Sequence, residues 1–239
     1  MGRKSAKIAA KKGANDKARG QVYTKCLKDI FMASKGGSGE LATNFLLKVA
    51  VERARKMNVP KEHIEKAIKK GQGGDGSNFE DISYEGYGPG GVAIFVETST
   101  DNSTRTVANV RAAFKKCGGS LGTSGSLEFV FERKSEFRIP AEGIDEDDFT
   151  LNMIDAGADD VEKEDDMFVV LGPMDLFGTI QEKLQEISVT PEEASLIRIP
   201  TSYKKADGET LEQIERLIGM LEDDDDVVTV YDNLEDDED

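Results

Sequence analysis

The sequence predicts an α+β protein, in which an N-terminal three-helix domain is followed by two α/β domains, the third inserted in the second. Three observations lead to this prediction. Three amphipathic helical patterns fill the first 74 residues, and segments of strand and helix pattern alternate after them. A last helix and strand, at about 208–221 and 227–231, lack partners unless they return to a sheet that begins near residue 79. The expected domains are a basic helical domain at 1–74, a glycine-rich linker at 75–78, a second domain at 79–134 plus 201–239, and an inserted third domain at 135–200.

Apolar stripes define the three helices of the first domain. The first stripe starts after Asp16, and the helix ends at Gly36 and Gly37, because glycine is common just past a helix end. A second helix is expected over about 41–57, and Pro60 suits the first turn of a third. The residues expected to face the interior are Val22, Cys26, Leu27, Ile30, Phe31, Ser34, Ala42, Phe45, Leu46, Val49, Ala50, Ala54, Ile64, Ala67 and Ile68.

Strand and helix patterns alternate after the linker. Two strands, 79–85 and 91–98, flank a turn at 86–90, and a helix over about 103–117 follows. The glycine-rich stretch 118–126 then leads into a strand at 127–131. From residue 135 the order is strand, helix, strand, strand, helix, strand, which is the ferredoxin-like βαββαβ pattern. These six elements are expected at 135–139, 145–156, 159–163, 167–171, 175–187 and 195–200.

Charge divides the chain where the helical domain ends. The first 74 residues hold 18 Lys and Arg against 6 Asp and Glu, whereas the remaining 165 hold 13 against 41. Clustered cations attract an anionic polymer and an acidic body repels it, so the split predicts a nucleic-acid partner for the basic domain. A merely solvated helical surface is the alternative interpretation. The residues expected to contact nucleic acid are Arg3, Lys4, Lys7, Lys11, Lys12, Lys17, Arg19, Lys25 and, on the helix at 103–117, Arg105 and Arg111.

Two glycine-rich segments can each be interpreted as a binding loop or as a structural element. Tyr84 and Tyr87 lie in YEGYGPGG (84–91), where an exposed tyrosine could stack on an unpaired base. The favoured alternative is a hairpin turn shaped by Gly and Pro, with one tyrosine packed inward. Gly71, Gly73 and Gly76 match a G-x-G-x-x-G string, but a helix precedes them and a strand follows. A dinucleotide site needs the opposite order, so this string is interpreted as a linker.

Candidates for catalysis or metal binding are few. His63 is the one histidine of the chain and is expected to face solvent on the third helix. Cys26 and Cys117 are too far apart in sequence for a disulfide framework, and zinc spacings such as CxxC are absent. The acidic runs at 222–226 and 235–239 are expected to be solvated. We therefore expect no enzyme activity, no cofactor, no metal and no small-molecule substrate.

Apolar runs are short throughout the chain. The longest aliphatic and aromatic runs, 92–96 and 167–171, have five residues each, whereas a membrane span needs about twenty. The basic N-terminal stretch is followed by no apolar segment of the kind found in signal peptides. These features predict a cytoplasmic protein with no membrane partner.

Three segments of the chain resemble the YebC family of bacterial proteins, probable transcriptional regulators, to which the mitochondrial translational activator of cytochrome c oxidase also belongs. The segments are YEGYGPGG (84–91), DNSTRTVANVRAAFKKCGGSLGTSGSLEFVF (101–131) and LEDDDDVVTVYDN (221–233). The resemblance extends over essentially the whole chain, and implies the same three-domain arrangement and no known catalytic activity. The chain departs from many members at its head, which reads GRKSA (2–6) without tryptophan, and at Asp232, where the family often has histidine. It is similar to the short-headed branch.

The resemblance and the charge division together predict a non-enzymatic regulatory protein. The first hypothesis is a DNA-binding regulator of transcription that acts through the basic N-terminal domain. The alternative is a ribosome-associated translation factor that binds rRNA and assists synthesis of proline-rich stretches, because some family members resemble such factors. A third hypothesis is a scaffold whose acidic body docks a basic partner.

Overall fold

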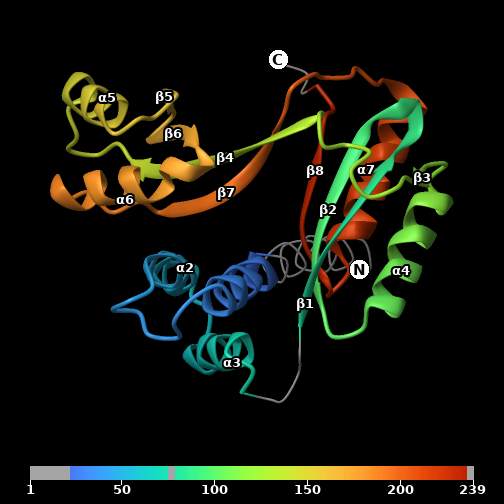
Figure 1. Cartoon of the computed structure of the whole chain (residues 1–239), viewed down its shortest axis with the longest axis horizontal. Helices are drawn as coiled ribbons and strands as arrows, with labels where there is room; N and C mark the ends of the chain where they lie inside the picture. The colour runs from blue at the N-terminus through green and yellow to red at the C-terminus, as the bar shows by residue number, and fades with distance from the viewer. Residues whose placement is uncertain (1–21, 75–78, 236–239) are drawn as a thin grey trace, which may run out of the picture. The chain divides into compact units, whose positions relative to one another are not determined.

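A computed structural model describes residues 22–74 and 79–235 of the chain (Figure 1). The chain divides into two compact units, residues 1–77 with 191–194 and residues 78–190 with 195–239. Helices occupy the described part of the N-terminal domain, and two four-stranded sheets with their helices occupy the rest. The predicted α+β class is therefore confirmed.

The N-terminal helices surround one apolar core. Residues 22–35 are helical, and α2 (Phe45–Lys56) and α3 (Lys61–Gly71) follow. Their apolar stripes meet because each helix leaves its charged positions toward water. The buried members of the core are Cys26, Ile30, Leu47, Val51, Ala54, Val59, Ile64 and Ala67.

The start predicted for the second helix, at residue 41, is wrong. The side chain of Asn44 accepts a hydrogen bond from the main-chain N–H of Leu47 at 3.0 Å, so α2 is capped at Asn44. Its amide also donates to the carbonyls of Ala33 and Ser38, both at 2.7 Å. These bonds hold the turn that precedes α2, and they leave Ala42, expected inside, exposed.

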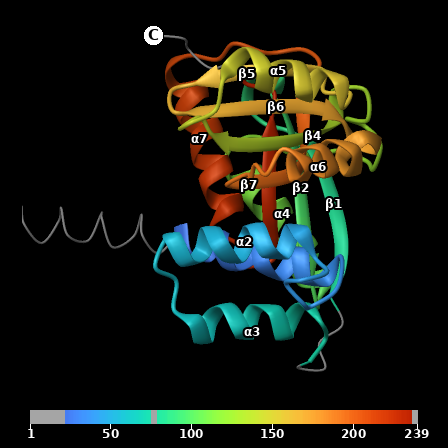
Figure 2. The same cartoon turned by 90° about the vertical axis from the view of Figure 1, so that its left-hand side faces the viewer.

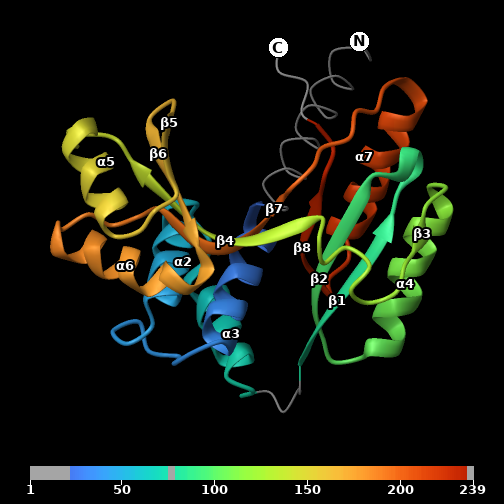
Figure 3. The ribbon, with the colours of Figure 1, turned by 45° about the horizontal axis from the view of Figure 1, so that its top comes forward.

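The first sheet joins strands from both ends of the second unit. Its order is β3 (Ser120–Leu121), β1 (Glu80–Tyr87), β2 (Ala93–Thr100) and β8 (Val227–Asp232). Helices α4 (Ser103–Lys116) and α7 (Gly208–Glu222) cover the same face (Figure 3). Strand β8 pairs with β2 in antiparallel register, so the last helix and strand return to this sheet as predicted.

The hairpin turn lies further along the chain than predicted. Gly86 pairs with Ile94 inside the β1–β2 ladder, and the turn runs from Gly88 to Val92 around a 3₁₀ turn, η1 (Pro89–Gly91). Gly90 and Gly91 have φ values of +68° and +74°, which L side chains rarely adopt. Gly86 serves another purpose, because a Cβ there would lie 2.6 Å from the Phe114 ring and 2.7 Å from the Ser120 carbonyl oxygen.

Replacing Gly86 by alanine is expected to lower the free energy of unfolding of the second unit by about 2 kcal/mol, the usual cost of overpacking a tight core. Strand β1 would have to move away from α4 and β3, since the added methyl group meets a buried ring and main chain. Urea denaturation followed by circular dichroism measures the loss. Gly219→Ala in α7 is the matched control, because nothing lies within 4 Å of its Cβ position, and equal stability of the two variants would contradict the prediction.

The second sheet has the predicted βαββαβ order. Its strands β5 (Asp160–Glu164), β6 (Met167–Pro173), β4 (Phe131–Pro140) and β7 (Glu193–Pro200) follow one another in that spatial order (Figure 2). Helix α5 (Glu146–Asp155) connects β4 to β5, while η2 (Met174–Leu176) and α6 (Phe177–Glu186) connect β6 to β7. Stacked ring pairs, Phe149 with Phe168 and Phe137 with Phe177, join the helices to the strands.

The strand predicted at 127–131 is wrong. Residues 124–130 form turns, and β4 begins only at Phe131 and then runs unbroken to Pro140, so it includes the strand expected at 135–139. Hydrogen bonds from Ser126 N–H to Thr123 and from Val130 N–H to Leu127 keep this apolar stretch out of the ladder. Because β4 crosses residue 135, the expected limits of the second and third domains stay a prediction.

Candidate nucleic-acid interface

Most of the predicted phosphate contacts lie outside the described residues. These are Arg3, Lys4, Lys7, Lys11, Lys12, Lys17 and Arg19. Lys25 is described and is exposed on the helix at 22–35, one position before the buried Cys26. Residues 22–74 still hold 11 Lys and Arg against 5 Asp and Glu. The basic character of the domain therefore does not depend on its first 21 residues alone.

The outer surface of the helical domain is rich in lysine. The packing of the three apolar stripes turns the intervening polar positions outward. The exposed cations are Lys25, Lys48, Arg55, Lys56, Lys61, Lys66, Lys69 and Lys70. Lysine is a flexible point charge suited to phosphate, whereas bases are read mainly by Arg, Asn and Gln in fixed pairs. This surface can position a nucleic-acid backbone and has little capacity to read sequence directly.

Arg53 has an internal role and is not part of that surface. Its guanidinium donates to the carboxylate of Asp29 at 3.2 Å. Burial raises the pKa of Asp29, and the nearby Arg53 opposes that shift. The pair joins the helix at 22–35 to α2 and so holds the lysine-bearing helices in register.

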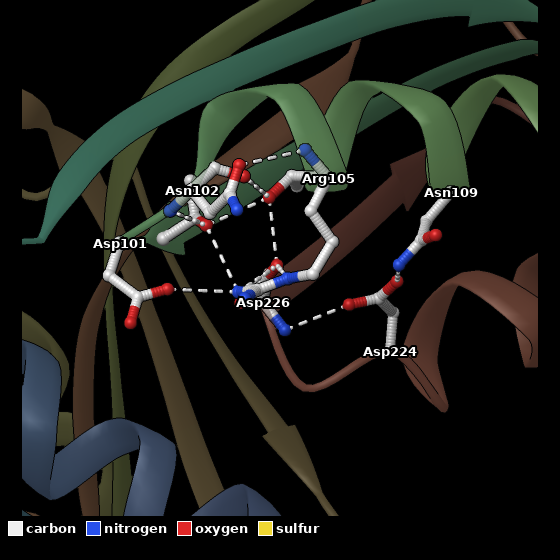
Figure 4. Close-up of polar contacts among 8 residues, drawn as sticks. Asp101, Asn102, Arg105, Asn109, Asp224 and Asp226 are labelled. Atoms are coloured by element: carbon white, nitrogen blue, oxygen red, sulfur yellow. Dashed lines mark hydrogen bonds and ion pairs between the residues drawn. The ribbon is translucent and has the colours of Figure 1, made fainter.

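Arg105, a predicted phosphate contact, is held in a carboxylate network at the start of α4 (Figure 4). Its guanidinium reaches Asp226 through Nη2 at 2.6 Å and Nε at 3.0 Å, and Asp101 at 3.0 Å. Asn102 caps the helix by accepting from the Arg105 N–H at 3.1 Å. Two carboxylates already share this cation, and its role toward phosphate stays a prediction.

Asp226 lies at the centre of this network and is almost buried, with 8% of its side chain exposed. It also accepts from the Thr106 hydroxyl at 2.8 Å. Burial by itself would raise the pKa of Asp226, but hydrogen bonds from Arg105 and Thr106 outweigh burial and hold the pKa below its usual range. The expectation that 222–226 is a solvated acidic run is therefore wrong for Asp226. Nothing in the local pattern reveals a contact between residues 121 positions apart.

The second half of α4 carries cations that the sequence also singles out. Arg111, Lys115 and Lys116 are exposed, while Val110, Ala113 and Phe114 face the core. No acidic residue occurs between Ser103 and Lys116. This helix therefore exposes cations within an otherwise acidic body, although Arg105 near its start is paired with carboxylates. Arg111 is exposed, and its contact with phosphate stays a prediction.

The two tyrosines of the glycine-rich hairpin have different surroundings. Tyr84 packs against the core formed by β2, α4 and α7, and burial raises its pKa. Tyr87, three residues further along β1, keeps 39% of its surface exposed. One tyrosine thus packs inward, as the hairpin interpretation expects, while Tyr87 is exposed and its role toward a ligand stays a prediction.

Sequence patterns did not reveal the role of Glu85, which lies between these tyrosines. Its buried carboxylate accepts from the Gly125 N–H at 2.8 Å and from the Leu127 N–H at 2.6 Å, and its main-chain oxygen accepts from Gly122 at 2.8 Å. Strand β1 thereby holds the loop 122–127 on the face of the sheet opposite α4. The main-chain N–H groups of Gly125 and Leu127 thus already have a carboxylate as their partner.

The candidates for catalysis are placed unfavourably for chemistry. His63 is exposed on α3, and both cysteines are buried as free thiols. Burial raises the pKa of the Cys26 thiol, which keeps it protonated. Within 22–74 and 79–235, no three His, Cys, Asp or Glu side chains lie close enough together to hold a metal ion. The helices in the same part of the chain are all too short or too polar to cross a membrane.

Comparison with known proteins identifies the family. Residues 3–74 match the TACO1/YebC protein N-terminal domain, and residues 79–234 match the TACO1/YebC second and third domain. A "Probable transcriptional regulatory protein" of Syntrophotalea carbinolica is 46% identical over 234 residues, covering 97% of this chain and 94% of its own. A protein of the same description from Geobacillus kaustophilus is 43% identical over 231 residues, covering 95% and 94%.

A solved structure shares both sequence and fold with the chain. The crystal structure of a conserved hypothetical protein from Aquifex aeolicus superimposes with a TM-score of 0.76 at 37% identity, covering 91% of this chain and 90% of that one. The likeness therefore includes the helical domain and both sheets. With two family models matching in sequence order and near full-length relatives, the chain belongs to the TACO1/YebC family.

Proposed function

We propose that this protein is a non-enzymatic, DNA-binding regulator of transcription that contacts nucleic acid through its basic N-terminal domain. The division of charge is the observation that carries the proposal, with 18 cations against 6 anions before residue 75 and 13 against 41 after it. The names of its relatives, probable transcriptional regulatory proteins, support the same function.

Binding through this domain is mainly electrostatic. Lysines on the outer faces of the three helices neutralise phosphates and release condensed counterions, which drives association. The acidic body repels the duplex and so favours contact with the basic domain, with Arg111 on α4 as a secondary phosphate contact. Because residues 22–74 show no cluster of base-reading side chains on that surface, sequence preference arises from the shape and deformability of the DNA.

The test is binding of the full chain to a duplex of about 30 base pairs across a series of salt concentrations. We expect log affinity to fall linearly with log salt, with a slope of about −0.9 for each phosphate neutralised. Absence of duplex binding at low salt would refute the proposal. A structured RNA of matching length and charge, measured in parallel, shows which nucleic acid the domain prefers.

A ribosome-associated translation factor is the second candidate. The lysine-rich surface favours it, because rRNA helices are recognised largely by shape and phosphate contacts and offer side chains little access to the bases of the deep groove. Crosslinking in cells, followed by sequencing of the DNA and the RNA recovered with the protein, separates the candidates. Dominance of rRNA in the recovered pool would replace the transcription proposal with this one.

A further inference from the structure

Three aromatic side chains of the second unit are exposed to solvent. Phe129 has 90% of its surface exposed, Tyr203 has 58% and Tyr87 has 39%. They come from three distant parts of the sequence: Tyr87 lies on strand β1, Phe129 in the loop before β4, and Tyr203 in the segment after β7. A single exposed aromatic residue is ordinary on a protein surface, but three that the fold gathers together indicate a binding surface.

The sheet places Tyr87 beside the loop that carries Phe129. Side chains alternate along a strand, so Tyr87 shares a face with Glu85, whose carboxylate binds the loop at Gly125 and Leu127. Tyr87 also pairs directly with Ala93. On that face Ala93 packs with Phe95, Leu127 and Phe131, and Phe129 lies between the last two in sequence.

Asn233 connects the same place to the segment that carries Tyr203. Its side-chain oxygen accepts from the Ala93 N–H at 2.7 Å, and its amide donates to the Ser202 carbonyl at 3.0 Å. Thr201, which precedes Ser202, donates through its hydroxyl to the Phe129 carbonyl at 3.0 Å and through its N–H to the Val130 carbonyl at 2.8 Å. The three aromatic residues are thus held around one junction at one end of the first sheet.

The main chain at Phe129 is anchored by the residues on either side of it. Leu127 is fully buried and Phe131 is nearly so, with the Phe131 ring edge-on to Phe95 at 6.1 Å between centroids. Leu127 and Phe131, each two positions from Phe129, are therefore anchored in the core, and the Phe129 ring between them stays exposed. A ligand that covers the ring therefore has to order only its side-chain rotation and not the main chain of the loop.

We propose that Tyr87, Phe129 and Tyr203 form an aromatic platform on which the unpaired bases of a single-stranded nucleic acid stack. The inference rests on the proposed nucleic-acid-binding function and adds a ligand class, since the basic domain grips phosphates and the platform holds bases. All three members are aromatic, as base stacking requires, and exposed Lys204 follows Tyr203 directly. Two nearby carboxylates are already paired, Glu132 with Lys134 at 2.9 Å and Glu235 with Lys205 at 3.6 Å.

The experiment measures binding of the full chain to a fluorescent single-stranded oligonucleotide of about 20 residues and to the duplex of the same sequence. Phe129→Ala and Tyr203→Ala should each weaken single-strand binding roughly tenfold while leaving duplex binding unchanged. Leu151→Ala is the matched control, because Leu151 is 62% exposed on α5, outside the platform, and its loss should change neither affinity. An oligonucleotide containing 5-iodouracil should crosslink to platform residues.

Two further variants identify the kind of contact. Phe129→Trp keeps a stacking ring and should retain single-strand affinity, whereas Phe129→Leu keeps apolar surface without a ring and should lose it. If the leucine variant binds the single strand as well as wild type does, no aromatic ring is needed at this position and the platform is refuted. Single-strand binding that no platform variant changes also refutes it, while leaving the proposed function intact. If the wild-type chain binds neither oligonucleotide, the proposed function fails, and the platform with it.

Discussion

Replacing Lys7, Lys11, Lys12 and Lys17 together by glutamate is expected to weaken binding to duplex DNA roughly a thousandfold at about 50 mM salt. Each lysine that no longer neutralises a phosphate removes about 0.9 from the slope of log affinity against log salt, so the slope should become shallower by about 3.6. These four lysines lie outside the described residues, and the prediction depends on their charge alone. Fluorescence anisotropy at several salt concentrations measures both quantities.

Two controls separate the charge of these lysines from their other properties. Replacing the same four residues by arginine preserves the charge and should preserve both affinity and slope. Arg216→Glu, an exposed position on α7 in the acidic body, should have little effect on either. If the slope of log affinity against log salt is unchanged in the glutamate variant, these four lysines do not contact the duplex. That result would favour the hypothesis of an acidic scaffold.

Replacing Asp226 by alanine is expected to lower the free energy of unfolding of the second unit by about 2–3 kcal/mol, because hydrogen bonds to a charged group are lost. Asp226 joins the N-terminal turn of α4 to the segment between α7 and β8 through Arg105 and Thr106. Urea denaturation measures the change. Asp225→Ala is the matched control, because the Asp225 carboxylate, next to Asp226 in sequence, is exposed and its removal should cost little stability.

The contribution of Asp226 should also depend on pH, with a definite sign. Its pKa in the folded state lies below the unfolded value of about 3.9, so the charged form stabilises the fold above that value. This stability is lost as pH falls through the folded pKa. The difference in unfolding free energy between wild type and Asp226→Asn should therefore be largest near neutral pH and shrink below about pH 4. A difference that stays constant down to pH 2 would show that the charge of Asp226 contributes nothing.

Features that depend on neighbouring residues were predictable from the sequence. Helix α4 and the βαββαβ unit lie close to where their patterns indicate, because apolar spacing records which face of an element is buried. The return of the last helix and strand to the first sheet followed from their lack of any other partner. Local patterns failed where a distant side chain decided the outcome, as Glu85 does for the loop at 122–127. The start of α2 is different, because its cap at Asn44 is a local contact with Leu47 that the apolar pattern alone does not record.

Some features of the candidate site could likewise be predicted from the sequence, and others could not. The charge division, Lys25 and the exposed cations of α4 are visible in the sequence, because electrostatic attraction requires only that charges be numerous and outward-facing. The pairing of Arg105 with Asp226 is not visible there, and neither is the exposure of Tyr87, Phe129 and Tyr203 that the proposed platform uses.

The sequence by itself thus determined the family, the sign of the charge that each part carries, and most of the secondary structure, though not β3 or the start of β4. Only the tertiary structure decided which charged side chains are paired and which aromatic side chains stay exposed. The physical reason is that spacing along a chain specifies the face of a helix or strand, whereas hydrogen bonds and ring contacts depend on distances that only the complete packing of sheets and helices establishes.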